Sequence, residues 1–82
     1  MYKLVVKLGV VETIQKFYDV VSKMDYDIDL VRGRYIVDAK SVLGIYSLDL
    51  SKPVDVVLHC DNENEYHQFI EDLRAANVEV IS

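Results

Sequence analysis

The sequence predicts an α+β fold, an open-faced sandwich in which helices pack on one face of an antiparallel or mixed sheet. Three observations lead to this prediction. The 82-residue chain is 51% hydrophobic, which suits a single domain over residues 1–82 with one modest core. Its apolar residues are mostly Val, Ile and Leu, joined by six Tyr, which favours strands. Strand-like and helix-like segments follow one another in the order β-α-β-β-α-β-α, with a further short strand expected at the C-terminus.

The first half of the chain predicts a strand, a helix and a hairpin. Residues 2–8 are β-branched and apolar and predict a strand. After Gly9, apolar residues recur at three- and four-residue steps, which is typical of a helix with one buried face. Residues 27–31 alternate as a strand does, and residues 35–39 are the return strand. Gly33 between them suits the tight turn of an antiparallel hairpin.

The second half predicts a short helix, a strand, a longer helix and a last strand. Ser41 starts the short helix, because its hydroxyl can accept from the free N–H groups of the first turn. Residues 54–59 predict a strand. Asn62 and Glu65 have the spacing of a capping box at the start of the longer helix. Residues 78–81 resemble a short final strand.

Composition excludes several classes of function. The net charge is −5 and the pI is about 4.8, which argues against nucleic-acid binding and against docking on an anionic membrane. Cys60 is the single cysteine, so no internal disulfide can form and a reducing compartment is expected. The sequence shows no signal peptide and no apolar run near the roughly 20 residues that span a bilayer. We therefore expect a cytoplasmic protein.

The chain has no pattern of catalytic residues, so we expect a protein that is not an enzyme and needs no cofactor or metal. It lacks a Gly-rich phosphate loop, a Ser-His-Asp arrangement and paired metal-ligand spacing. His59 and Cys60 are neighbours in or next to a strand, so their side chains should point to opposite faces rather than to one ion. His67 flanks the apolar stripe of the last helix and is expected to be solvated or half-buried.

Two groups of charged residues remain. Three carboxylates near the second strand are expected on its solvent side: Asp25, Asp27 and Asp29. Four basic residues could gather near Ser41 and meet an acidic partner or a phosphate, with plain surface charge as the alternative: Arg32, Arg34, Lys40 and Lys52.

The segment AKSVLGI, residues 39–45, together with the element order, resembles the histidine-containing phosphocarrier (HPr) family of the bacterial sugar phosphotransferase system. It is similar to the regulatory serine segment of that family. The resemblance implies that Ser41 is a candidate site for a serine kinase of the HPr-kinase type. An ordinary helix cap explains Ser41 by itself and is the preferred interpretation, and the two interpretations are compatible.

One family feature is absent. HPr proteins carry a phosphorylatable histidine in a G-hydrophobic-His-x-Arg-Pro-Ala segment after the first strand, whereas residues 9–14 here read GVVETI. Val11 stands in place of the histidine and offers no nucleophile, and Glu12 would repel a phosphoryl group. The resemblance thus implies a non-phosphocarrier member that acts by protein binding in sugar-uptake regulation or a related bacterial control circuit.

In the family, the short middle helix belongs to the partner-binding surface. The resemblance therefore implies that Val42, Ile45 and Tyr46 contact a protein partner, which could be an HPr-type serine kinase or a phosphotransferase-system or regulatory protein. The alternative is a small ligand-binding or dimerisation module of ACT-like topology, in which residues 78–81 supply a sheet edge for a homodimer. Strand order distinguishes the two, because the HPr-like and ferredoxin-like sheets place their strands differently.

Overall fold

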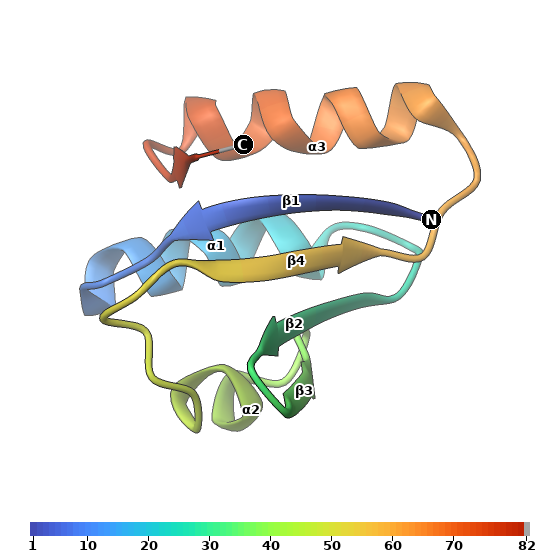
Figure 1. Cartoon of the computed structure of the whole chain (residues 1–82). Coiled ribbons are helices and arrows are strands. Elements are labelled where there is room, and N and C mark those ends of the chain that lie inside the picture. Colours follow the sequence, from blue (N-terminus) through green and yellow to red (C-terminus); the bar gives the residue numbers. More distant parts are fainter. Residues whose placement is uncertain (82) are drawn as a thin grey trace.

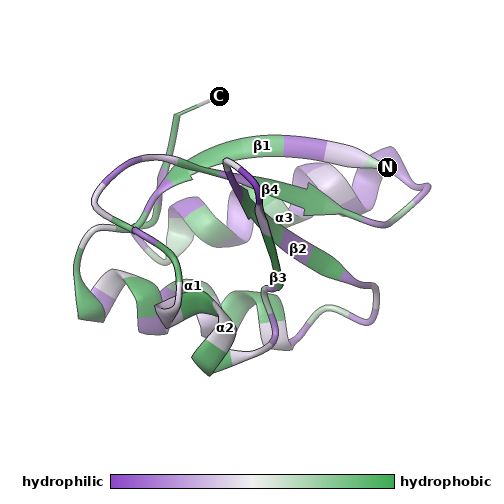
Figure 2. Ribbon diagram, turned by 60° about the horizontal axis from the view of Figure 1, so that its bottom comes forward, coloured by the Kyte–Doolittle hydropathy of each residue, from purple (hydrophilic) through white to green (hydrophobic). Residues whose placement is uncertain are grey.

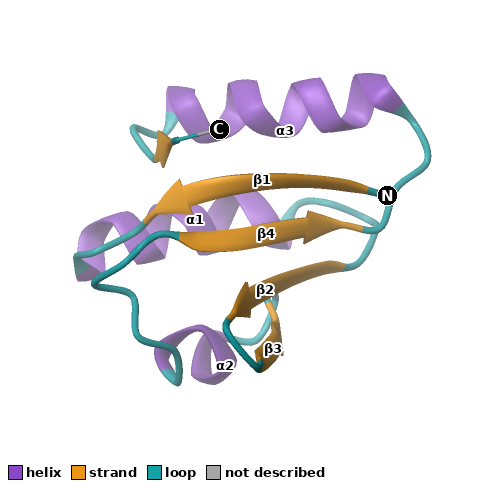
Figure 3. Cartoon of the chain, viewed as in Figure 1, coloured by secondary structure: helices purple, strands orange, loops and turns teal. Residues whose placement is uncertain are grey.

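The computed structural model describes residues 1–81, which form the predicted order of elements (Figure 1; Figure 3). Three of these elements are helices, and none of the helices within the described residues has the length and apolar character needed to cross a lipid bilayer. The elements are β1 (Tyr2–Lys7), α1 (Val11–Ser22), β2 (Ile28–Arg32), β3 (Tyr35–Asp38), α2 (Val42–Tyr46), β4 (Val54–Leu58), α3 (Glu63–Ala75) and β5 (Glu79–Val80).

The five strands form one antiparallel sheet in the order β3-β2-β4-β1-β5. Figure 1 shows β4 at its centre, with β1 on one side and β2 on the other. A ferredoxin-like sheet would instead place the third strand between the first two. Here β3 lies at the sheet edge and pairs with β2 alone. The ACT-like alternative is therefore wrong, and the antiparallel order is that of the open-faced sandwich.

The short C-terminal strand is present. In β5, Val80 pairs with Val6 and Glu79 pairs with Lys7 of β1. The Ile81 amide extends the pairing by donating to the Val5 carbonyl at 2.8 Å. This strand covers the edge of β1 that would otherwise face solvent.

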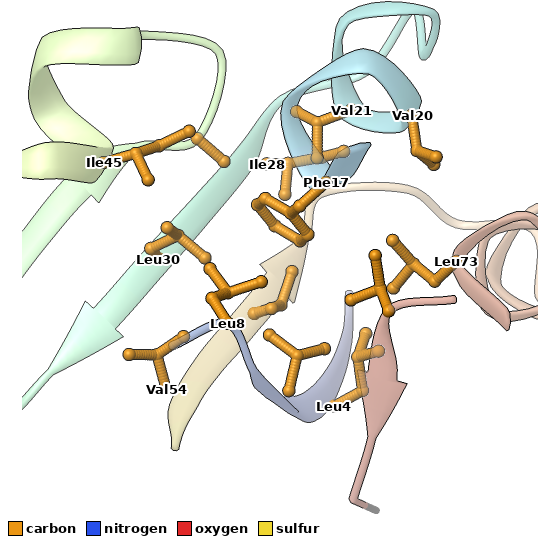
Figure 4. Close-up of a cluster of buried hydrophobic side chains, with 14 of the residues drawn as sticks. Leu4, Leu8, Phe17, Val20, Val21, Ile28, Leu30, Ile45, Val54 and Leu73 are labelled. Carbon is orange, nitrogen blue, oxygen red and sulfur yellow. The ribbon is translucent and has the colours of Figure 1, made fainter. Parts of the chain in front are cut away.

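One face of the sheet is covered by all three helices. Alternate strand residues are buried, as in β4, where Val54, Val56 and Leu58 are buried but Asp55 and Val57 are only half-buried. Figure 4 shows the cluster above that face, with Phe17 from α1, Ile45 from α2 and Leu73 from α3 beside the strand residues. The other face has no covering layer formed by the described residues, as the prediction required.

Local contacts correct one prediction and confirm another. The Asn62 side chain accepts from the Asn64 amide at 2.8 Å, while the Glu65 amide donates to the Asn62 carbonyl at 3.1 Å. Asn62 therefore caps α3, but the predicted capping box with Glu65 is not formed.

In the β2–β3 turn, Gly33 has a φ of 60° and Arg34 has a negative φ. This pattern is that of a type II′ hairpin, which favours glycine at its first central position.

Tyr26 carries a buried polar group. Its hydroxyl has no hydrogen-bond partner among residues 1–81, although the ring packs against the core. The pKa of Tyr26 is raised from 10.0 to about 12, mainly because burial disfavours the charged form, and Coulomb interactions with nearby Cys60 and Glu65 make smaller contributions to the same rise.

Replacing Tyr26 with Phe is expected to raise the free energy of unfolding by about 1 kcal/mol at neutral pH, because it removes an unpaired buried hydroxyl. The difference should widen above pH 10, since Tyr26 ionises in the unfolded chain while it stays neutral in the folded protein until about pH 12. Urea denaturation of both proteins across this pH range measures the effect. A variant that is less stable at neutral pH would contradict the unpaired hydroxyl.

Candidate partner-binding surface

The start of α1 presents apolar side chains to solvent. Gly9 has a φ of 66°, and its amide donates to the Leu50 carbonyl at 3.1 Å, which holds the start of α1 against the loop after α2. Val10 is the cap residue and makes no side-chain hydrogen bond. The side chains of Val10 and Val11 are 61% and 59% exposed. The acidic residue of the first turn is Glu12, whose carboxylate lies 3.4 Å from the Lys16 ammonium.

The start of α2 is capped by Ser41. The Ser41 hydroxyl accepts from the Gly44 amide at 3.1 Å, so the cap expected from the sequence is formed. Gly44 allows this close turn, because a Cβ atom there would lie 3.3 Å from the Ser41 Cβ and 3.4 Å from the Asp38 carbonyl oxygen. Ser41 itself is exposed. Its hydroxyl is therefore both part of the cap and open to solvent.

The Lys40 side chain binds the end of α1 rather than Ser41. Its ammonium donates to the Met24 carbonyl at 2.7 Å, beyond the C-terminal end of α1. The backbone amide of Lys40 is also bound, to the Asp38 carboxylate at 2.9 Å. The predicted basic surroundings of Ser41 are thus not formed by this side chain, which instead joins the end of α1 to the start of α2.

A groove of about 350 Å³ separates α1 from α2. Its walls are Ile14, Gln15, Tyr18 and Asp19 of α1 and Val42, Ile45 and Tyr46 of α2. In Figure 2, hydrophobic segments of the two helices lie side by side. Five large apolar residues at the start of α1 and on α2 are exposed, and we call them the α1–α2 patch: Val10, Val11, Val42, Leu43 and Tyr46. Of these, Val42 and Tyr46 also line the groove.

Two assignments within α2 change. Ile45, a predicted partner contact, is fully buried and belongs to the core, so it supports the patch from beneath. Leu43, which was not singled out, is 83% exposed. A helix of five residues is too short for its apolar spacing to reveal which residue faces the core. Val42 and Tyr46 are 40% and 45% exposed, as a surface role requires.

The basic residues gather elsewhere than predicted. Arg32 and Arg34 line a hollow at the C-terminal end of α2, beside Asp49, rather than at Ser41. Lys52 is close enough to Asp49, together with Arg32, to help lower the pKa of its carboxyl group below its usual value, after the larger effect of hydrogen bonds from Ser51. The two clusters, apolar and basic, are therefore distinct surfaces.

The remaining titratable candidates lie away from the patch. His59 is exposed and Cys60 is buried, so their side chains lie in different surroundings, as alternation predicts. Asp29 is half-buried, and its Oδ2 atom lies 2.8 Å from His59 Nε2. Asp29 is therefore paired with His59 and is not simply a solvated carboxylate. Asp27 is exposed. His67 is also exposed and lies 3.4 Å from Glu63 on α3.

The sheet order and the two exposed helix starts define an HPr-like open-faced sandwich. The structure is similar to the crystal structure of HPr-C-His from Thermoanaerobacter tengcongensis, with a TM-score of 0.72 and 20% identity over 93% of this chain and 94% of that chain. A comparison with curated proteins gives no match.

Residues 11–77 match the family model described as "PTS HPr component phosphorylation site". This match spans most of the chain, so the protein belongs to the HPr family of the sugar phosphotransferase system. Phosphocarriers of this family are not enzymes, and they interact with other proteins of that system.

The different positions of Ile45 and Leu43 can be tested by their effects on stability. Ile45→Ala is expected to lower the free energy of unfolding by about 2–5 kcal/mol, because it leaves a cavity in the core. Leu43→Ala should change it by less than about 0.5 kcal/mol, because that side chain is in solvent. Urea denaturation of the two variants measures both values. Equal losses would mean that the two side chains are buried alike.

Proposed function

We propose that this HPr-family protein acts by binding protein partners and does not carry a phosphoryl group on a histidine. The observation that carries the proposal is the exposed α1–α2 patch, which includes Val11 at the position that resembles that of the family histidine. The partners are proteins of the phosphotransferase system, an HPr-type serine kinase or a related bacterial regulator. Such a role belongs to the cytoplasm.

The start of α1 is unsuited to phosphoryl transfer. A phosphocarrier needs a nucleophilic nitrogen and positive groups that hold the transferred phosphoryl group. Val11 provides a hydrocarbon side chain there, and residues 9–14 contain no His, Arg or Lys. Glu12 adds a negative charge in the first turn, only partly offset by Lys16. The features that remain at this helix start favour apolar contact.

The patch is suited to protein binding. Five large apolar side chains are exposed on two neighbouring helices of a chain that is otherwise rich in charge. Clustered apolar surface of this kind marks interaction sites on small proteins. The groove between α1 and α2 adds a recess into which a side chain of the partner can insert.

Ser41 is the proposed site of regulation. Its hydroxyl is exposed and precedes Val42 and Leu43 of the patch directly. A phosphoserine there would place about two negative charges beside an apolar contact surface. Because the Lys40 ammonium is bound to the Met24 carbonyl, the phosphate would be stabilised mainly by the backbone N–H groups at the start of α2. Phosphorylation of Ser41 is therefore expected to weaken binding to an apolar surface of a partner and to strengthen binding to a basic one.

Leu43→Glu is expected to weaken binding to the phosphotransferase-system donor protein or the serine kinase at least about tenfold, because it places a charge in the apolar contact. Isothermal titration calorimetry with each purified partner measures this. Ile36→Glu is the matched control, since Ile36 is 68% exposed on β3, outside the patch. Equal loss in both variants, or none in Leu43→Glu, would contradict binding through the patch.

Intact mass measured after reaction with ATP and an HPr-type serine kinase tests Ser41. We expect one acid-stable phosphate on the parent protein and none on Ser41→Ala, because the hydroxyl is exposed. A parallel reaction with phosphoenolpyruvate and the donor protein should add no phosphate. Acid-labile phosphate in that reaction would locate a phosphoryl acceptor at His59 or His67 and would overturn the non-carrier role.

A further inference from the structure

A second hollow lies between the β2–β3 hairpin and the segment after α2. It has a volume of about 520 Å³ and is lined by Arg32, Gly33, Arg34 and Tyr35 of the hairpin and by Ser47, Leu48 and Asp49. We call it the hairpin cleft. It shares no lining residue with the groove between α1 and α2, so it is independent of the proposed partner surface.

The two arginines of the cleft line it together with Asp49 but form no ion pair with that carboxylate. Neither Arg32 nor Arg34 forms an ion pair with any residue in the described part of the chain. Arg32 is half-buried opposite Tyr35, and its Nε atom is buried without a hydrogen-bond acceptor from residues 1–81. Burying a guanidinium nitrogen without a hydrogen-bond acceptor costs free energy. An acceptor oxygen supplied by a ligand would remove that cost.

Asp49 neutralises only part of the charge. Its Oδ1 atom accepts from the amide of Ser51 at 3.1 Å and from the hydroxyl of the same residue at 2.6 Å. These hydrogen bonds orient the carboxylate toward its own loop. Arg32, Arg34 and Lys52 therefore leave a surplus of positive charge at this place, in a chain whose net charge is −5.

We infer that the hairpin cleft binds a small organic phosphate monoester, with its phosphate between the guanidinium groups of Arg32 and Arg34. A phosphate monoester carries close to two negative charges at neutral pH, which matches the surplus. A guanidinium group can donate two parallel hydrogen bonds to two oxygens of the same phosphate. Tyr35 is 70% exposed beside them and offers a ring face to the organic part of the ligand.

The test is a titration of the ¹⁵N-labelled protein, followed by NMR, with inorganic phosphate, glycerol phosphate and citrate at equal ionic strength. We expect glycerol phosphate to shift the amide signals of residues 32–35 and 47–49. Arg32→Gln and Arg34→Gln should each weaken its binding about tenfold or more. Arg74→Gln is the control, because Arg74 is an exposed arginine of α3 outside the cleft, and its loss removes the same charge.

Three results would overturn the inference. The first is the absence of shifts at the cleft, and the second is an equal loss of binding in Arg74→Gln, which would show attraction by net charge alone. The third is citrate binding as tightly as glycerol phosphate, which would exclude selection for phosphate. Partner binding is tested by Leu43→Glu, which leaves the cleft intact, so the two proposals can fail separately.

Discussion

The register of β4 is the constraint on which the rest of the structure depends. This central strand pairs with β1 over five residues and with β2 over four. Val54, Val56 and Leu58 point into the core, whereas Asp55 lies on the opposite side. A shift of one residue would move these three apolar side chains to solvent and bury the Asp55 carboxylate. The register thus decides which face the helices cover.

The surface on α2 follows from the small share of the core that this helix occupies. A five-residue helix cannot persist by itself, so it depends on the Ser41 cap and on one fully buried side chain, Ile45. Because Ile45 faces the core, the turn of the helix directs Leu43 and Tyr46 away from it, and both are exposed. Its other apolar residues therefore stay exposed, which is why the shortest helix carries most of the patch.

The sequence predicts local features well and distant ones poorly. Alternation and helical spacing depend on neighbours in the chain, and they gave every element in order, including β5. The exposure of Leu43, the hydrogen bond from Lys40 to Met24 and the meeting of Arg32 with Asp49 depend on which segments the sheet brings together. No spacing within a short segment encodes those contacts. The AKSVLGI resemblance located the start of α2 but could not tell which of its residues face outward.

The groove between α1 and α2 is fixed at both ends by hydrogen bonds. The Lys40 ammonium binds the Met24 carbonyl at 2.7 Å beyond one end of α1, and the Gly9 amide binds the Leu50 carbonyl at 3.1 Å at the other. The two helices are therefore held at a set separation before any partner arrives. Association at the proposed surface would then lose little conformational entropy on this side, and the partners would dock as rigid bodies. Selectivity among partners would rest on shape, which a mobile helix could not provide.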